Sequence, residues 1–153
     1  AHNCKVGNRV IMSNNATLAG HVTVEDHAII GGHTPIHQFV NIGCHSMVGG
    51  LSRVTHDIPP YTIGGDIPYR FGGVNIIGLQ RHQFSLSTRQ ELTKAFKLLY
   101  RSNLSLNDAL NQCEQELDPL PEIKHLIQFC RKTKRGLMNC NSALPQNEEP
   151  TNS

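Results

Sequence analysis

Aliphatic residues and methionine recur at every sixth position over the first third of the chain. The series is Val6, Met12, Leu18, Val24, Ile30, Ile36, Ile42, Val48 and Val54. A second set of small or β-branched residues follows each member by four positions: Val10, Ala16, Val22, Ala28, Thr34, Val40, Ser46, Ser52 and Ile58. An amphipathic helix repeats its apolar positions every three or four residues, so this period excludes one. One large and one small inward residue per hexad predict a β-helix built from hexapeptide repeats.

The repeat also predicts which residues lie above one another. If three hexads form one turn of a triangular coil, residues eighteen positions apart stack at the inter-strand spacing of ~4.8 Å. The six-residue repeat stops at Pro59 and Pro60, because proline has no backbone N–H to donate to a neighbouring strand. We therefore expect about three turns of coil over residues 1–60.

The rest of the chain divides into three further segments. Residues 61–84 are rich in glycine and lack the six-residue repeat, which predicts an irregular connecting segment. Residues 85–138 show helical periodicity and predict a small helical domain, with helices from about 87, at about 105–117 and at about 120–134. Ser87 and Gln90 fit a capping box for the first of these, and Pro121 suits the first turn of the last. Residues 139–153 are polar and predict a disordered tail.

Composition narrows the classes of function and the setting. The formal charge of +2 on 153 residues is too small to indicate a nucleic-acid partner. Five scattered cysteines without a C-x-x-C pair indicate neither a disulfide framework nor a zinc site, and they fit a reduced, cytoplasmic setting. No apolar stretch approaches the ~20 residues of a transmembrane helix. The chain starts at Ala1 in mid-hexad, so we expect it to be the C-terminal part of a longer protein.

Seven of the nine histidines fall in the repeat region, and none occupies an inward position. The eighteen-residue frame places His2 in one column with Gly20 and Gln38, and His21 beside them. A histidine can act as a general base near neutral pH. A glycine lets a substrate approach the backbone, whose N–H can stabilise an oxyanion. These residues suit acyl transfer to a hydroxyl by direct attack, because no activated serine or cysteine is evident.

Two other interpretations of the histidines stay open at this point. They can be ordinary polar residues on the sides of a β-helix. They can also be metal ligands, since γ-class carbonic anhydrases are hexapeptide β-helices that bind zinc through three histidines, and His21 and His37 are conceivable members of such a set. We rank zinc binding below acyl transfer and expect neither a metal site nor a cofactor.

Several longer strings are more specific than the repeat. They include His2-Asn3-Cys4-Lys5-Val6-Gly7-Asn8-Arg9, Asn14-Asn15-Ala16-Thr17-Leu18-Ala19-Gly20-His21-Val22, Ile36-His37-Gln38-Phe39 and Gly73-Val74-Asn75-Ile76-Ile77-Gly78-Leu79-Gln80-Arg81. These strings, spread over residues 1–137, closely resemble the acyl-[acyl-carrier-protein]–UDP-N-acetylglucosamine O-acyltransferase family. The resemblance implies a left-handed parallel β-helix of hexapeptide repeats followed by a small C-terminal helical domain. It also implies a homotrimer with active sites between subunits.

The resemblance further implies a reaction and a set of roles. The acyl donor is acyl carrier protein, the acceptor is the 3-hydroxyl of UDP-N-acetylglucosamine, and the step is the first of lipid A biosynthesis. The residues that match the family's functional positions are His2 as general base, Gly20 as oxyanion donor, His21 and Gln38 as substrate contacts, Asn75 and Arg81 in the nucleotide-binding segment, and His37 and Gly50 along the acyl groove.

The sequence departs from the family pattern at several positions. Asn3 stands where an aspartate usually follows the base, His82 stands where a second arginine is common, and residues 66–70 differ from the usual string. These departures affect the expected strength of the base, the phosphate contacts and the acyl length. The alternatives are the N-acyltransferase of the same pathway, a zinc-binding γ-class carbonic anhydrase-like protein and a non-catalytic hexapeptide protein.

Overall fold

The computed structural model describes residues 1–140 and places the hexapeptide region in a parallel coil. Eight two-residue strands follow one another: β1 (Lys5–Val6), β2 (Ile11–Met12), β3 (Thr17–Leu18), β4 (Thr23–Val24), β5 (Ile29–Ile30), β6 (Pro35–Ile36), β7 (Asn41–Ile42) and β8 (Met47–Val48). Strands β1 to β5 each pair in parallel with the strand three places on, in a register of eighteen residues, as between Lys5 and Thr23. The predicted turn length is confirmed.

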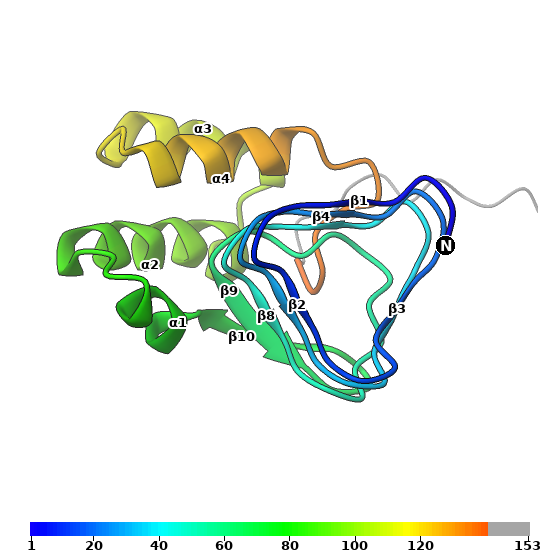
Figure 1. The fold of residues 1–153 in the computed structure, drawn as a ribbon. Helices are drawn as coiled ribbons and strands as arrows, with labels where there is room; N and C mark the ends of the chain where they lie inside the picture. Colours follow the sequence, from blue (N-terminus) through cyan, green and yellow to red (C-terminus); the bar gives the residue numbers. More distant parts are fainter. Residues whose placement is uncertain (141–153) are drawn as a thin grey trace, which may run out of the picture.

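The coil is triangular and left-handed (Figure 1). Its three faces carry the strand sets β1-β4-β7, β2-β5-β8 and β3-β6. With the N-terminal turn nearest the viewer, the chain runs anticlockwise as it recedes, from β1 to β2 to β3. This hand is the one the family resemblance implies, and it is an exception to the right-handed rule for parallel crossovers.

Every sixth residue adopts a left-handed backbone conformation at a corner of the triangle. These residues are Asn3, Arg9, Asn15, His21, His27, His33, Phe39, His45 and Leu51, with φ between 52° and 64°. Asparagine and histidine are among the non-glycine residues that tolerate this region best. Four of the histidines therefore also stabilise the backbone conformation of the turns.

We name the corners by their residues: corner 1 (2–3, 20–21, 38–39), corner 2 (8–9, 26–27, 44–45) and corner 3 (14–15, 32–33, 50–51).

The core of the coil consists of the two periodic sets predicted from the sequence. Val24, Ile30 and Ile42 are at most 1% exposed, whereas Val6 in the first turn is 51% exposed because no turn covers it. The small set includes buried hydroxyls that stay hydrogen-bonded. For example, Ser46 Oγ donates to the Gly43 carbonyl at 2.7 Å. A small inward residue can thus be polar without leaving an unsatisfied group.

Residues 61–84 are more regular than the sequence predicts. Strand β9 (Thr62–Gly65) pairs in parallel with β8, and β10 (Arg70–Val74) pairs antiparallel with β9. Helix α1 (Ile76–Arg81) follows directly. The glycines lower the strand propensity of this segment, so the sequence does not predict its strands. The strands form because the segment pairs with the edge of the coil.

Three longer helices complete the described chain: α2 (Leu86–Arg101), α3 (Leu106–Glu116) and α4 (Pro121–Arg131). The cap of α2 is Ser85, whose Oγ accepts from Thr88 N at 3.1 Å, two residues before the predicted cap. Pro121 occupies the first turn of α4, as predicted. Leu92, Leu110 and Leu126 bury themselves between the helices. The predicted tail falls largely on residues 141–153, which lie outside the described residues.

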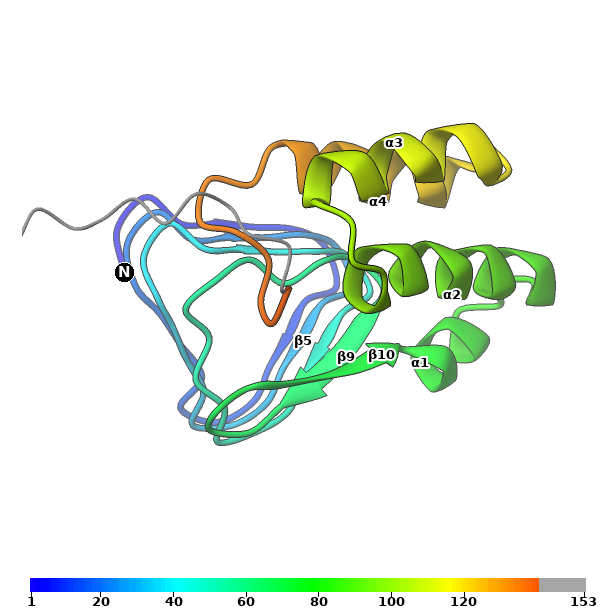
Figure 2. The same cartoon turned by 180° about the vertical axis from the view of Figure 1, so that it is seen from behind.

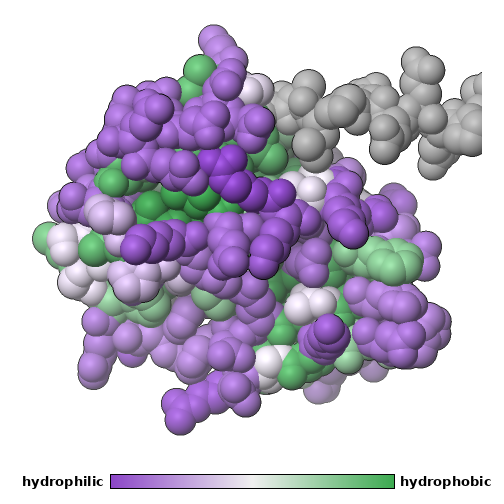
Figure 3. Space-filling view, turned by 90° about the horizontal axis from the view of Figure 1, so that it is seen from above, coloured by the Kyte–Doolittle hydropathy of each residue, from purple (hydrophilic) through white to green (hydrophobic). Residues whose placement is uncertain are grey.

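The helices lie together beside one corner of the coil (Figure 2). Seen from the side of α3 and α4, most of the surface is hydrophilic, with hydrophobic side chains showing in narrow strips (Figure 3). None of the helices in residues 1–140 combines the length and the apolar character needed to span a bilayer.

Candidate active site at corner 1

Backbone hydrogen bonds stack the three residue pairs of corner 1. His21 N–H donates to the His2 carbonyl at 3.0 Å, and Phe39 N–H donates to the Gly20 carbonyl at 3.1 Å. The column predicted from the eighteen-residue period is therefore present. It places His2 directly against Gly20, with His21 beside both.

The His2 ring lies where a side chain of residue 20 would be. A Cβ on Gly20 would lie 2.8 Å from His2 Cε1 and 3.1 Å from His2 Nε2. The φ of Gly20 is not in the left-handed region, so the turn itself does not require glycine here. The glycine is needed because an imidazole packs against its Cα.

The Gly20 N–H donates no hydrogen bond within residues 1–140. The same hexad position at corner 2 shows what such an N–H can bind. Asn8 N–H donates to Asp26 Oδ1 at 2.7 Å, and Cys44 N–H donates to Glu25 Oε2 at 2.9 Å. This position of the turn therefore accommodates an anionic oxygen, which is what an oxyanion donor must do.

Aromatic contacts fix the rings next to this pair. The His21 ring lies edge-on to His2, with centroids 5.1 Å apart, and stacks on Phe39 at 4.7 Å. Phe39 is 53% exposed, so an apolar ring faces solvent at this corner. Gln38 is exposed and precedes Phe39 in the turn. The four predicted residues His2, Gly20, His21 and Gln38 are thus brought together.

The two predicted acyl-groove residues border a single face of the coil. His37 ends the strand face that β6 contributes, and its Nδ1 donates to the Gln38 carbonyl at 3.0 Å. Gly50 lies at corner 3, at the start of the same face in the next turn. About five residues of extended chain, roughly 15–20 Å, separate corner 3 from corner 1. An extended ligand could lie along this face.

Asn75 and Arg81 lie away from corner 1. Asn75 is buried at the start of α1; its Oδ1 accepts from Gly78 N at 3.3 Å, and its Nδ2 donates to the His45 carbonyl at 3.0 Å. Arg81 is exposed at the end of α1. Figure 1 shows α1 and the N-terminus on opposite sides of the coil. Within one chain, therefore, the α1 residues and His2 do not lie in the same site.

Corner 2 holds a second group of histidines, which the sequence did not predict. The rings of His27 and His45 stack with centroids 4.6 Å apart, and His82 approaches both edge-on at 4.8 Å. The eighteen-residue spacing of His27 and His45 is a signal that could have found the first pair. The position of His82 depends on β9, β10 and α1, whose arrangement the sequence did not reveal.

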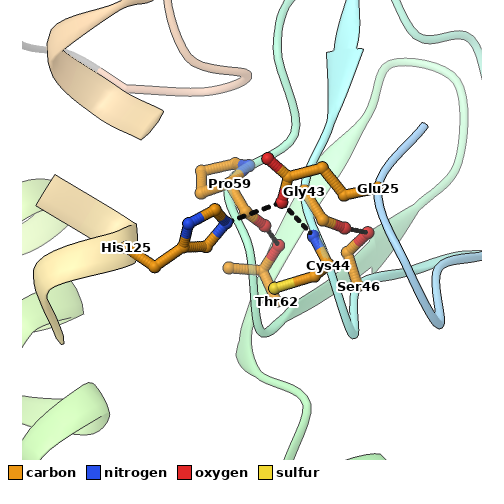
Figure 4. A network of polar contacts seen from close by, with 7 residues as sticks. All are labelled: Glu25, Gly43, Cys44, Ser46, Pro59, Thr62 and His125. Atoms are coloured by element: carbon orange, nitrogen blue, oxygen red, sulfur yellow. Dashed lines mark hydrogen bonds and ion pairs between the residues drawn. The ribbon is translucent and has the colours of Figure 1, made fainter. Parts of the chain in front are cut away.

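A polar network next to this group ties α4 to the coil (Figure 4). His125 Nε2 contacts Glu25 Oε2 at 2.7 Å, and the same carboxylate oxygen accepts the Cys44 N–H. Hydrogen bonds with the Cys44 side chain and with Glu25 raise the pKa of His125 to about 10. The ring is therefore charged at neutral pH and forms an ion pair across the junction.

Comparison with known proteins identifies the family to which this arrangement belongs. Residues 57–138 match the family described as UDP-N-acetylglucosamine O-acyltransferase, domain 2. The chain belongs to this family. The match starts at the end of the coil and includes all of the helical region, so the resemblance seen in the sequence is confirmed.

Relatives in the O-acyltransferase family extend the likeness over the coil. The chain is 49% identical over 137 residues to the acyl-[acyl-carrier-protein]–UDP-N-acetylglucosamine O-acyltransferase of Thermodesulfovibrio yellowstonii, covering 90% of this chain and 53% of the relative. It is 53% identical over 93 residues to the enzyme of that name from Chlamydia caviae, covering 60% of this chain and 33% of that one. The chain thus spans about half the length of the first relative and a third of the second.

Solved structures of the family have the same fold. The UDP-N-acetylglucosamine acyltransferase of Bacteroides fragilis superimposes with a TM-score of 0.88 at 38% identity, over 90% of this chain and 54% of that one. The Acinetobacter baumannii structure gives a TM-score of 0.87 at 40% identity, with the same coverage. The predicted left-handed β-helix with C-terminal helices is therefore confirmed.

Proposed function

We propose that this chain supplies part of an enzyme that transfers a fatty acyl group from acyl carrier protein to the 3-hydroxyl of UDP-N-acetylglucosamine, as the first step of lipid A biosynthesis. The observation that supports it most directly is the pair at corner 1. There a histidine ring packs against a glycine whose N–H is free within the described chain. Family membership supplies the two substrates.

The proposed mechanism is direct attack with His2 as general base. His2 takes the proton from the sugar hydroxyl while the hydroxyl oxygen forms a bond to the thioester carbonyl carbon. The Gly20 N–H stabilises the negative charge that develops on the carbonyl oxygen. The carbon–sulfur bond then breaks, and the imidazolium returns its proton to the departing thiolate. The nearby Cys4 Sγ donates to the Ala19 carbonyl at 3.1 Å and to the His2 carbonyl at 3.9 Å, and no hydrogen bond joins it to the His2 ring within residues 1–140, so no acyl-enzyme is invoked.

The remaining predicted residues position the substrates in this proposal. His21 is held by His2 and Phe39, and with Gln38 it offers polar groups to the sugar. His37 and Gly50 border the face along which the acyl chain lies. The absence of a side chain at Gly50 leaves room for a longer chain than a bulky residue would.

We also propose that the working form is a homotrimer with sites between subunits. The corner 1 residues and the α1 residues Asn75 and Arg81 lie on different sides of one chain, so a complete site needs a second copy. Asn75 holds α1 in place through its cap, which leaves Arg81 to contact the nucleotide phosphates. The exposed Phe39 ring suits burial against a neighbouring copy. Sedimentation should show a trimer that Phe39→Asp dissociates; a monomeric wild type refutes the proposal.

The acyl donor in this proposal is acyl carrier protein, which is acidic. Basic residues on α2 would bind it electrostatically. Arg89, Lys94 and Arg101 provide that charge, although Lys94 already pairs with Glu91 at 2.8 Å. Electrostatic complementarity of this kind acts mainly on the rate of encounter. Charge reversal at Arg101 should therefore raise KM for the carrier, and an unchanged KM counts against this surface.

We place the reaction in the cytoplasm, on the grounds of cysteine usage.

The deciding experiment measures acyl transfer by wild type and His2→Ala. Because the chain matches about half of its relatives, the assay also uses a chimera in which residues 1–137 replace the matching segment of the Thermodesulfovibrio yellowstonii enzyme. Loss of the base should lower kcat about 10²–10⁴-fold. His33→Asn, at corner 3, keeps the left-handed backbone; it is the control and should keep normal turnover. Near-normal activity of His2→Ala in an active chimera refutes the mechanism. Transfer to a glucosamine amine instead of the hydroxyl would favour the N-acyltransferase alternative.

A further inference from the structure

Three histidines from three separated segments meet at corner 2. His27 and His45 come from successive turns of the coil, and His82 comes from the end of α1. One ring nitrogen of each lies within 4.8 Å of the other two. None of the three takes part in the acyl-transfer mechanism proposed above. They form one of two potential metal-ligating groups within residues 1–140.

The central ring has a nitrogen available for a ligand. His45 Nδ1 is buried without a hydrogen-bond partner in the described chain. A buried polar atom left unsatisfied is uncommon and calls for an explanation.

Aromatic residues and a pocket surround this group of histidines. Phe84 approaches the His45 ring edge-on at 4.9 Å, and Tyr61 stacks at 6.1 Å. The same two aromatic residues line a pocket of about 510 Å³ together with His27 and His45. An apolar shell around the ligands limits solvent access, and an adjoining pocket leaves space for a water on the metal.

We propose that His27, His45 and His82 bind one divalent transition-metal ion, Zn²⁺, with water in the fourth position. Three imidazoles are a donor set that zinc accepts in tetrahedral sites. Bond lengths of 2.0–2.1 Å place tetrahedral ligands about 3.4 Å apart, so nitrogens that lie within 4.8 Å of one another need to approach by at most about 1.4 Å. Small rotations of the rings, shared among three side chains, achieve this. The exposed His82 has space to make the largest movement.

The neighbouring group Glu25, Cys44 and His125 is the less suitable site. Its ligand atoms also lie within 4.8 Å of one another. However, Glu25 Oε2 already accepts hydrogen bonds from His125 and from Cys44 N–H. A metal would have to displace a proton from His125, whose pKa is raised to about 10. By contrast, His45 Nδ1 has no hydrogen bond within the described residues that a metal would have to replace.

The bound ion would connect the coil to the helical region. It would fix the end of α1 to two turns of the β-helix, because its ligands come from both. Metal binding that occurs only in the folded state stabilises that state. We therefore expect Zn²⁺ to raise the melting temperature of the protein.

The test is a titration of the purified protein, free of any polyhistidine tag, with Zn²⁺ in competition with a chromogenic chelator and with Co²⁺ as a spectroscopic probe. We expect one equivalent per chain and visible Co²⁺ bands typical of tetrahedral coordination. His27→Asn and His82→Gln should each weaken binding on the order of 100-fold. Asparagine keeps the left-handed backbone at residue 27. His33→Asn, the same exchange at corner 3, is the matched control and should stay within about twofold of wild type.

Three results would overturn the proposal. The first is no binding of Zn²⁺ or Co²⁺ above the level of a His27→Asn/His82→Gln double variant. The second is an equal loss in His33→Asn, which would indicate a nonspecific surface effect. The third is an intense sulfur-to-cobalt charge-transfer band that Cys44→Ser abolishes, which would assign the ion to the neighbouring group. If His27→Asn fails to fold by circular dichroism, the exposed His82→Gln variant still decides the matter.

Discussion

Replacing Gly20 by alanine tests whether the position of the His2 ring limits catalysis. The added Cβ would lie 2.8 Å from His2 Cε1 and 3.1 Å from Nε2. Nonbonded carbons prefer about 3.5–4.0 Å, so the ring has to move by about 1 Å. The backbone itself should not be strained, because the φ of Gly20 lies outside the left-handed region. The substitution thus displaces the proposed base while retaining the Gly20 N–H donor.

The expected effect is a large loss of turnover without a loss of stability. A displacement of about 1 Å in a catalytic group can cost about 100-fold in rate, equivalent to about 2.7 kcal/mol of transition-state stabilisation. Replacing glycine by alanine in a compatible conformation stabilises a protein by about 0.4–1 kcal/mol. The melting temperature should therefore stay the same or rise by about 1–3 °C.

The assay is kcat for acyl transfer in a double-mutant cycle with His2→Ala. If Gly20→Ala acts through the ring, it should add nothing further once His2 has been removed. Two results would refute the reasoning. One is wild-type turnover in Gly20→Ala, and the other is a loss that multiplies fully with that of His2→Ala, which would indicate a separate role for the backbone.

Three further predictions concern other parts of the molecule. Arg81→Ala should raise KM for the UDP-sugar about tenfold with kcat nearly unchanged, as for lost phosphate binding; a fall in kcat alone would exclude this role. Gly50→Met should shift the preference of the enzyme toward shorter acyl chains by about 1–3 kcal/mol in kcat/KM, and an unchanged chain-length profile would remove Gly50 from the groove. The raised pKa of His125 means that its contribution to stability is complete below about pH 6.5 and is lost as the pH rises through about 10. Because its side chain is 37% exposed, we expect a loss of about 1–2 kcal/mol, measured by urea unfolding, that is absent in His125→Gln.

The sequence predicted the coil well because the hexad is a local pattern with a fixed geometric meaning. The period of Val24, Ile30 and Ile36 determines which residues point inward, and the eighteen-residue turn places His2 on Gly20 without further information. The helices after residue 85 were found for a similar reason, since helical periodicity is also local.

The features that the sequence did not predict depend on contacts between distant segments. Strand β9 forms by pairing with β8, although two of its four residues, Gly64 and Gly65, disfavour strands. The approach of His82 to His45 depends on that pairing, so the histidine group at corner 2 could not be foreseen. The dual use of Asn75, as a helix cap and as a donor to the His45 carbonyl, was equally hidden.

The constant register of eighteen residues has a consequence for insertions and deletions in the coil. Removing one hexad between residues 2 and 20 would preserve the inward and outward positions, so the fold should survive. However, the residue stacked on His2 would then be Asp26 instead of Gly20, with His27 in the left-handed position beside it. The proposed base would face a carboxylate side chain and lose the bare Cα against which its ring packs. Length changes of eighteen residues leave the columns of the coil aligned, whereas changes of six or twelve keep a stable coil but place different residues opposite His2.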